Sequence, residues 1–98
     1  MVKALYKAPD RQPVLIDLVN GIKSVKEKLE GSMEAWSLTE EVAIYCNSES
    51  FTNGMAYNCT IGNFVFNGPI LLLRFDEEAQ LESVTDEDIQ MLTAEIIE

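Results

Sequence analysis

Two runs of carboxylates near the end of the chain are the side chains best suited to chemistry. The first is Asp76-Glu77-Glu78, followed by Glu82, and the second is Asp86-Glu87-Asp88. Neither run has the alternating oxygen ligands, central glycine and terminal glutamate of a calcium loop. A glycosidase would need one carboxyl held in an apolar pocket to raise its pKa, whereas both runs are expected to be exposed. We therefore expect no metal site and no catalytic residues here.

Other catalytic groups are scarce in this sequence. Histidine is absent, which excludes enzymes built on Ser-His-Asp or Cys-His chemistry and removes the commonest zinc ligand. Cys46 and Cys59 fit neither a CxxC redox pair nor a four-ligand metal site, so we expect reduced, mostly buried thiols, with one disulfide as the alternative. Gly62 and Gly68 lack the lysine and helix of a phosphate loop. The sequence predicts a protein that is not an enzyme and needs no cofactor.

Charge is distributed unevenly along the chain. Seventeen acids against seven bases give a net charge of −10, and residues 31–98 contain Arg74 alone against thirteen acids. This balance argues against direct binding to nucleic acid or to anionic lipid. An acidic surface of this kind either keeps a small domain soluble or steers it onto a strongly positive groove, such as a nucleic-acid channel. The expected partner is therefore a basic nucleic-acid-binding protein.

A second candidate surface lies between Asn47 and Asn63, which is predicted to be a long loop with one short strand near Tyr57–Ile61. Its candidate contact residues are Phe51, Asn53, Met55 and Tyr57. Aromatic anchors beside adaptable amides are typical of a binding surface. The alternative is that these side chains fold back as a lid over the core, and the sequence leaves both interpretations open.

Strands must position most of these residues. Alternating or continuous apolar residues predict strands at Val2–Tyr6, Val14–Leu18, Met33–Leu38, Val42–Cys46, Phe64–Phe66 and Ile70–Phe75. Trp36 and Tyr45 are expected to pack across neighbouring strands, because no cationic side chains surround them to hold a nucleic-acid backbone.

Two helices complete the predicted fold, within a single domain over residues 1–98. The first is expected to be capped by Asn20 and stopped by Gly31, and the second to be capped by Thr85. Their inward residues are Ile22, Val25 and Leu29 in the first helix, and Ile89, Leu92 and Ile96 in the second. The element order predicts an α+β fold, with a mainly antiparallel sheet of about five to six strands and two helices packed on one face.

The environment is expected to be the cytoplasm. No apolar run approaches the length of a membrane span, and the N-terminus lacks the apolar stretch of a signal peptide. With 47% hydrophobic residues the chain is too apolar to be disordered. The sequence predicts a folded, soluble protein.

The order of short segments is also informative. Val2-Lys3-Ala4-Leu5 is followed by a helix ending in Gly31, then Tyr45-Cys46-Asn47, Asn53-Gly54 with Asn58, and the acidic stretch from Asp76 to Ile89. In this order the segments resemble a family of small domains of unknown function from Gram-positive phages and conjugative elements. That family has no assigned catalytic residues.

In size and charge the chain is also similar to the small acidic anti-CRISPR proteins that inhibit type II-A systems. The resemblance implies a non-enzymatic anti-defence protein of the bacterial host cytoplasm. It would bind a basic RNA-guided type II nuclease through an acidic surface and block nucleic-acid loading or binding. The alternative is a small-molecule or peptide binding module that uses the Asn53–Asn58 loop as a lid and acts in counter-defence or regulation.

Overall fold

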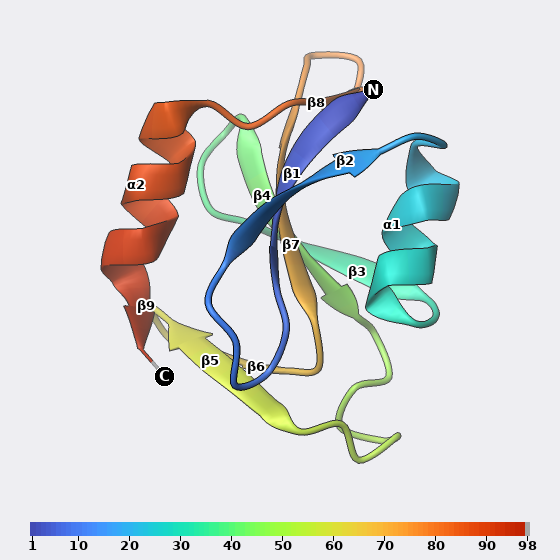
Figure 1. Ribbon diagram of the computed structural model, residues 1–98, viewed down its shortest axis with the longest axis vertical. Helices are drawn as coiled ribbons and strands as arrows, with labels where there is room; N and C mark the ends of the chain where they lie inside the picture. The colour runs from blue at the N-terminus through green and yellow to red at the C-terminus, as the bar shows by residue number, and fades with distance from the viewer. Residues whose placement is uncertain (98) are drawn as a thin grey trace.

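The computed structural model describes residues 1–97, which form two sheets and two helices (Figure 1). The elements in chain order are β1 (Val2–Lys7), β2 (Val14–Leu18), α1 (Ile22–Leu29), β3 (Met33–Ser37), β4 (Val42–Asn47), β5 (Tyr57–Ile61), β6 (Phe64–Asn67), β7 (Ile70–Phe75), β8 (Leu81–Glu82), α2 (Asp86–Glu95) and β9 (Ile96–Ile97). The strand expected near Tyr57–Ile61 is present. The two-residue strands β8 and β9 were not predicted, because so short a segment carries no periodicity.

The larger sheet has six strands in the order β2-β1-β7-β4-β3, with β8 paired to β7. Every pairing in it is antiparallel. β4 lies next to β7 at the centre, and all six of its residues are buried, whereas the edge strands β2 and β3 are mostly exposed. The predicted α+β class and the mainly antiparallel sheet are therefore confirmed.

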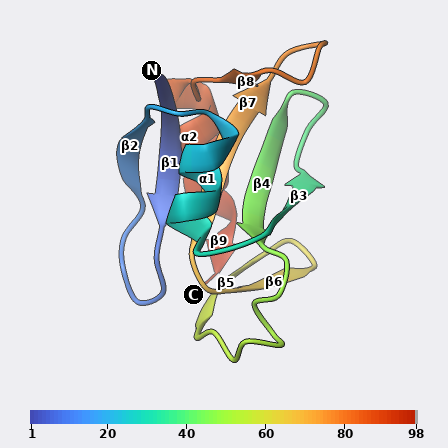
Figure 2. The ribbon, with the colours of Figure 1, turned by 90° about the vertical axis from the view of Figure 1, so that its right-hand side faces the viewer.

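Both faces of this sheet are covered. Ile44 and Leu72 point into one core cluster, while Tyr45 and Leu71, their neighbours along the same strands, point into the other. Helix α1 contributes Val25 and Leu29 to the second cluster. Helix α2 covers the first cluster through Leu92, so the helices lie on opposite sides of the sheet (Figures 1 and 2).

The expectation that both helices pack on one face was therefore wrong. Side chains alternate between the two faces of a strand, and β4 and β7 are apolar at successive positions. Each face of the central strands consequently needs its own cover. A single layer of helices would have left Ala43, Tyr45, Leu71 and Leu73 in water.

Helix α1 begins and ends differently from its prediction. Gly21, not Asn20, occupies the N-cap, with φ of 53° and no side-chain hydrogen bond, and Glu30 ends the helix in the left-handed region with φ of 65°. Gly31 lies one position beyond that stop. Val25 and Leu29 are buried as expected, but Ile22 is 43% exposed, because it stands in the first turn at the rim of the sheet.

Helix α2 begins as predicted, at Thr85. The Thr85 hydroxyl accepts a hydrogen bond from the Asp88 backbone N–H, and the Asp88 carboxylate accepts one from the Thr85 N–H. This reciprocal capping box satisfies two of the N–H groups that every helix start leaves unpaired. Leu92 is buried as predicted and Ile89 is half-buried, but Ile96 lies beyond the helix, in β9, where it pairs with Ile61.

The smaller sheet, in the order β6-β5-β9, packs beside α2 on the same face of the larger sheet. Its Cys59, Ile61 and Phe66 are buried in the first core cluster. The expected strand Phe64–Phe66 thus exists, but the turn after it leads into a different sheet. Both cysteines are buried and unbridged, as expected, and no disulfide forms.

A buried polar link joins the two sheets. The Lys7 ammonium donates to the Asn58 side-chain oxygen at 2.7 Å, and the Asn58 amide donates to the Lys7 carbonyl at 2.8 Å and to the Gly68 carbonyl at 2.7 Å. Lys7 is only 1% exposed and Asn58 3%. A buried amide is tolerated only when its hydrogen bonds are made, so Asn58 fixes the position of β5 relative to the end of β1.

No helix within residues 1–97 has the length and apolar character needed to cross a membrane.

Asp88 holds α2 in place electrostatically as well as through its cap. Its carboxylate also accepts two hydrogen bonds from the Arg74 guanidinium, at 2.9 and 3.1 Å. Burial alone would raise the pKa of this carboxyl, but the hydrogen bonds from Thr85 and Arg74 outweigh burial and lower the pKa. The charged form of Asp88 therefore stabilises the folded protein.

Replacing Asp88 by Ala is expected to lower the free energy of unfolding at neutral pH by about 1–3 kcal/mol, through the lost cap and the lost hydrogen bonds to Arg74. Urea denaturation measures the free energy of unfolding of each variant. Asp86→Ala, in the same turn but exposed, should cost less than about 1 kcal/mol.

The contribution of Asp88 to stability should also depend on pH, because folding lowers its pKa. The difference in free energy of unfolding between the wild type and Asp88→Asn should be full above the ordinary carboxyl pKa and shrink as pH falls through the lowered pKa. Equal losses for Asp86→Ala and Asp88→Ala would contradict this role.

Candidate functional site

A hollow of about 560 Å³ lies between the β3–β4 turn and the β7–β8 turn. Five of its six lining residues are acidic: Glu40, Glu41, Asp76, Glu77 and Glu82. The sixth is Phe75, at the end of β7. We call this site the acidic hollow. It brings together carboxylates that lie up to 42 positions apart in the sequence, since the two ends are residues 40 and 82.

The strand register creates the acidic hollow. Val42 of β4 pairs with Arg74 of β7, and the Phe75 N–H donates to the Glu41 carbonyl at 2.9 Å. The turn before β4 and the turn after β7 therefore meet at one end of the sheet. Asp76 shapes the second turn, since its carboxylate accepts from the N–H groups of Glu78 and Gln80, both at 2.9 Å.

Arg74 is the only basic residue after position 30, and it already forms ion pairs within the fold. Its guanidinium forms ion pairs with Glu41, at the rim of the acidic hollow, and with Asp88 at 2.9 Å. The hydrogen bonds that Arg74 donates to Asp88 and Glu41 raise its pKa above its ordinary value. Within residues 1–97, Glu40, Glu77 and Glu82 form no ion pair and no side-chain hydrogen bond.

The predicted acidic residues therefore separate into three groups. Asp76, Glu77 and Glu82 line the acidic hollow. Glu78, Asp86 and Glu87 are exposed outside it. Asp88 is buried and serves the cap and Arg74, so it offers no charge to a partner.

Glu40 and Glu41 belong to the hollow but were not among the predicted site residues. They lie in the turn between β3 and β4, and only the pairing of β4 with β7 reveals which other turn they face.

A second hollow, of about 320 Å³, lies between β3, β6 and the loop after β4. Its aromatic lining comes from Trp36, Phe51, Phe64 and Phe66. The other lining residues are Glu34, Cys46, Val65, Ser48, Ser50 and Asn63. The rings of Trp36 and Phe64 lie 4.6 Å apart, centre to centre, at an angle of 44°. We call this site the aromatic hollow.

The predicted loop contacts are only partly brought together. Phe51 lines the aromatic hollow and is 66% exposed, so it is not a lid over the core. Asn53 is exposed, and Met55 packs its sulfur against Gly68 on the other side of the loop. The Tyr57 hydroxyl is used within the fold, sharing a hydrogen bond with Thr60 at 2.8 Å and donating to the Ile97 carbonyl at 3.2 Å.

Trp36 has a different neighbour from the one expected. It pairs with Ile44 across β3 and β4, whereas Tyr45 lies opposite Ala35. Tyr45 therefore points into the core cluster on the other face of the sheet. Phe64, far along the chain, is the aromatic partner of Trp36, and nothing in the sequence signals that contact.

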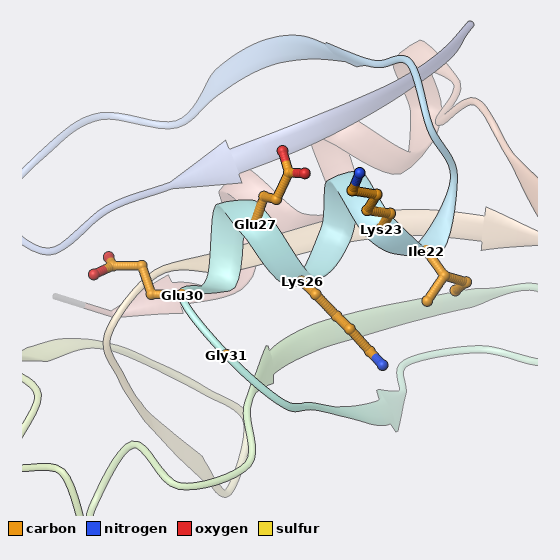
Figure 3. A pocket seen from close by; sticks show the side chains of 6 residues that line it. All are labelled: Ile22, Lys23, Lys26, Glu27, Glu30 and Gly31. Carbon is orange, nitrogen blue, oxygen red and sulfur yellow. The ribbon is translucent and has the colours of Figure 1, made fainter.

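A third hollow lies along helix α1 and is shown in Figure 3. It is lined by Ile22, Lys23, Lys26, Glu27, Glu30 and Gly31. The side chains of Lys26 and Glu30 point in different directions (Figure 3). Since its polar groups do not converge on a common point, this surface has no arrangement that would select a ligand.

Metal coordination finds no support among residues 1–97, where no three His, Cys, Asp or Glu side chains are grouped so as to hold an ion.

The model of a family described as a domain of unknown function, DUF3846, matches residues 2–97. The chain belongs to this family. No curated protein and no solved structure matches it. The resemblance to a family of small domains of unknown function is thereby confirmed. The matched residues include those that line the acidic hollow and the aromatic hollow.

The Cys46 thiol is expected to be unreactive at neutral pH. Burial and the nearby Glu34 carboxylate raise the pKa of Cys46 to about 11, and the thiolate is the reactive form. Alkylation by iodoacetamide, followed by peptide mass spectrometry, should be at least about 10-fold slower at Cys46 in the folded protein than in urea. Glu34→Gln should speed alkylation of folded Cys46 and leave Cys59 unchanged. Equal rates for Cys46 in the folded and unfolded protein would contradict this.

Proposed function

We propose that this protein acts by binding and not by catalysis, with its acidic hollow seated against a basic surface of a nucleic-acid-handling protein. The acidic hollow is the observation that carries the proposal. Within residues 1–97, its five carboxylates form one ion pair, between Glu41 and Arg74, and Arg74 is also paired with Asp88. Like charges this close repel one another and lower stability, and a positively charged partner would relieve that repulsion.

The leading candidate partner is an RNA-guided type II nuclease. Such a nuclease holds its guide and target in a positively charged channel, and an acidic domain of 11.0 kDa could occupy part of that channel. Nucleic-acid loading or binding would then be blocked. This proposal extends the resemblance to small acidic anti-CRISPR proteins, and it makes the protein an anti-defence factor of a phage or conjugative element, acting in the cytoplasm of the bacterial host.

The aromatic hollow favours a second candidate function, a small-molecule or peptide binding module acting in counter-defence or regulation. Its volume of about 320 Å³ lies at the small end of ligand pockets, and Phe51 presents an exposed ring beside it. The two candidates differ in their dependence on salt. Docking through the acidic hollow should weaken as salt rises, whereas a neutral ligand in the aromatic hollow should be indifferent to it.

Inhibition of a type II nuclease is expected to be stoichiometric. The protein is titrated against a fixed amount of nuclease with guide RNA and target DNA, and cleavage is measured. Activity should fall and level off near a simple molar ratio, with protein and RNA unchanged in mass, because occupancy consumes one inhibitor for each target. Loss of activity at substoichiometric amounts, with a modified product accumulating, would show catalysis instead. Undiminished cleavage at excess inhibitor would exclude this nuclease as the partner.

Charge in the acidic hollow should control the association rate. Glu40, Glu77 and Glu82 take no part in the folded network of residues 1–97, so changing all three to Gln removes charge without removing a contact. We expect association with the partner to slow by about 10-fold at low salt, with a smaller change in dissociation, since long-range attraction acts on encounter. Surface plasmon resonance at several salt concentrations measures both rates.

A matched control is Glu27, Glu30 and Glu95 changed to Gln, which alters net charge equally but lies outside the acidic hollow. Its association rate should stay closer to that of the wild type. Equal slowing by the two triple variants would mean that net charge, and not the acidic hollow, steers the encounter.

A further inference from the structure

Exposed apolar side chains gather around the aromatic hollow. Trp36 is 38% exposed, Phe64 40%, Val65 50% and Phe51 66%, and all four line it. They come from β3, β6 and the loop after β4, which meet only in the folded chain. A contiguous apolar patch on a small domain keeps large side chains in contact with water, and such patches mark binding sites.

One carboxylate faces these rings. Glu34 lies on β3 two residues before Trp36, and its Oε1 atom accepts a hydrogen bond from the Trp36 indole N–H at 2.9 Å and a weak one from the Cys46 thiol at 3.9 Å. The indole and the carboxylate are thus held in a fixed relation. No Lys or Arg within residues 1–97 forms an ion pair with Glu34.

The charge of this hollow is therefore uncompensated. None of its ten lining residues is basic, and Glu34 is the only one that is acidic. The Cys46 thiol is neutral at physiological pH, because burial raises its pKa to about 11. A ligand entering the hollow meets aromatic rings and a single negative charge.

We propose that the aromatic hollow binds an arginine side chain of a partner protein. Aromatic rings attract cations through their negative faces, and guanidinium stacks on such rings more often than ammonium does. A planar guanidinium can lie against a ring while donating in-plane hydrogen bonds to the Glu34 carboxylate. The volume of about 320 Å³ suits one side chain and not a large ligand.

The negative charge of Glu34 disfavours an anion as the occupant, and a neutral apolar group would leave that charge uncompensated. This site is distinct from the acidic hollow, with which it shares no lining residue. The inference is independent of docking through the acidic hollow, but it rests on the second candidate function, which places a ligand in this same aromatic hollow. It can be tested without any partner protein.

The experiment titrates the isolated protein with N-acetyl-arginine amide, and in parallel with the lysine and citrulline analogues, at constant ionic strength. Citrulline has nearly the shape of arginine but no charge. The protein has a single tryptophan, so the Trp36 indole N–H resonance and tryptophan fluorescence both report on this hollow. We expect saturable arginine binding with a dissociation constant on the order of 1–10 mM, weaker lysine binding, and at least about 10-fold weaker citrulline binding.

Variants then assign the site. Glu34→Gln keeps the size of the side chain and an oxygen acceptor but removes the charge, and it should weaken arginine binding by about 10-fold. Phe64→Leu should weaken it several-fold by removing one ring. Glu95→Gln, at an exposed position on α2 that lines none of the three hollows, is the matched control and should leave arginine binding unchanged.

Three outcomes would overturn the inference. They are the absence of saturable change at Trp36, equal binding of arginine and citrulline by the wild type, and equal weakening by Glu34→Gln and Glu95→Gln. The comparison of arginine with citrulline uses only the wild type, so it holds even if a variant folds poorly. Binding of lysine as tightly as arginine would reject the preference for guanidinium.

Discussion

The fold depends on one constraint, which is that the two central strands are apolar on both faces. β4 is buried along its whole length and β7 over its first four residues. Both faces of the larger sheet must therefore be covered by other elements. Helix α1 closes one face, and α2 together with the smaller sheet closes the other. A chain of 98 residues has few apolar side chains to spare once both layers are filled. The carboxylates of Glu40, Glu41, Asp76 and Glu77 lie in the turns at one end of these two strands.

The positions of the acidic hollow and the aromatic hollow follow from this arrangement of strands. The acidic hollow lies where the β3–β4 and β7–β8 turns meet, since the register of β4 against β7 brings their ends together. The aromatic hollow lies where the smaller sheet reaches the edge strand β3 and sets Phe64 against Trp36. Asn58 supports this second arrangement, because its three hydrogen bonds hold β5 against the end of β1.

The acidic hollow and the aromatic hollow differ in the chemical groups that they present to a partner. The acidic hollow offers five carboxylates around Phe75, and their attraction for a cation acts at long range and is screened by salt. The aromatic hollow offers rings and one carboxylate, which suits a single cationic side chain at short range. Both hollows are complementary in charge to the positively charged partner proposed above, and arginine is enriched among the residues that carry much of the binding energy of interfaces.

The sequence by itself determined the elements with strong local signals. Alternating or continuous apolar residues placed the main strands, and Thr85 marked the start of α2, because strand patterning and helix capping act over a few residues. It also determined that the second part of the chain is acidic. Only the tertiary structure decided which acids stand together: Asp88 went to a buried cap, while Glu40 and Glu41 joined Asp76 and Glu77. Only the tertiary structure decided, too, that the helices lie on opposite faces of the larger sheet and that Trp36 contacts Phe64. These features depend on sheet order and register, which are set by the packing of distant segments and leave no periodicity in the sequence.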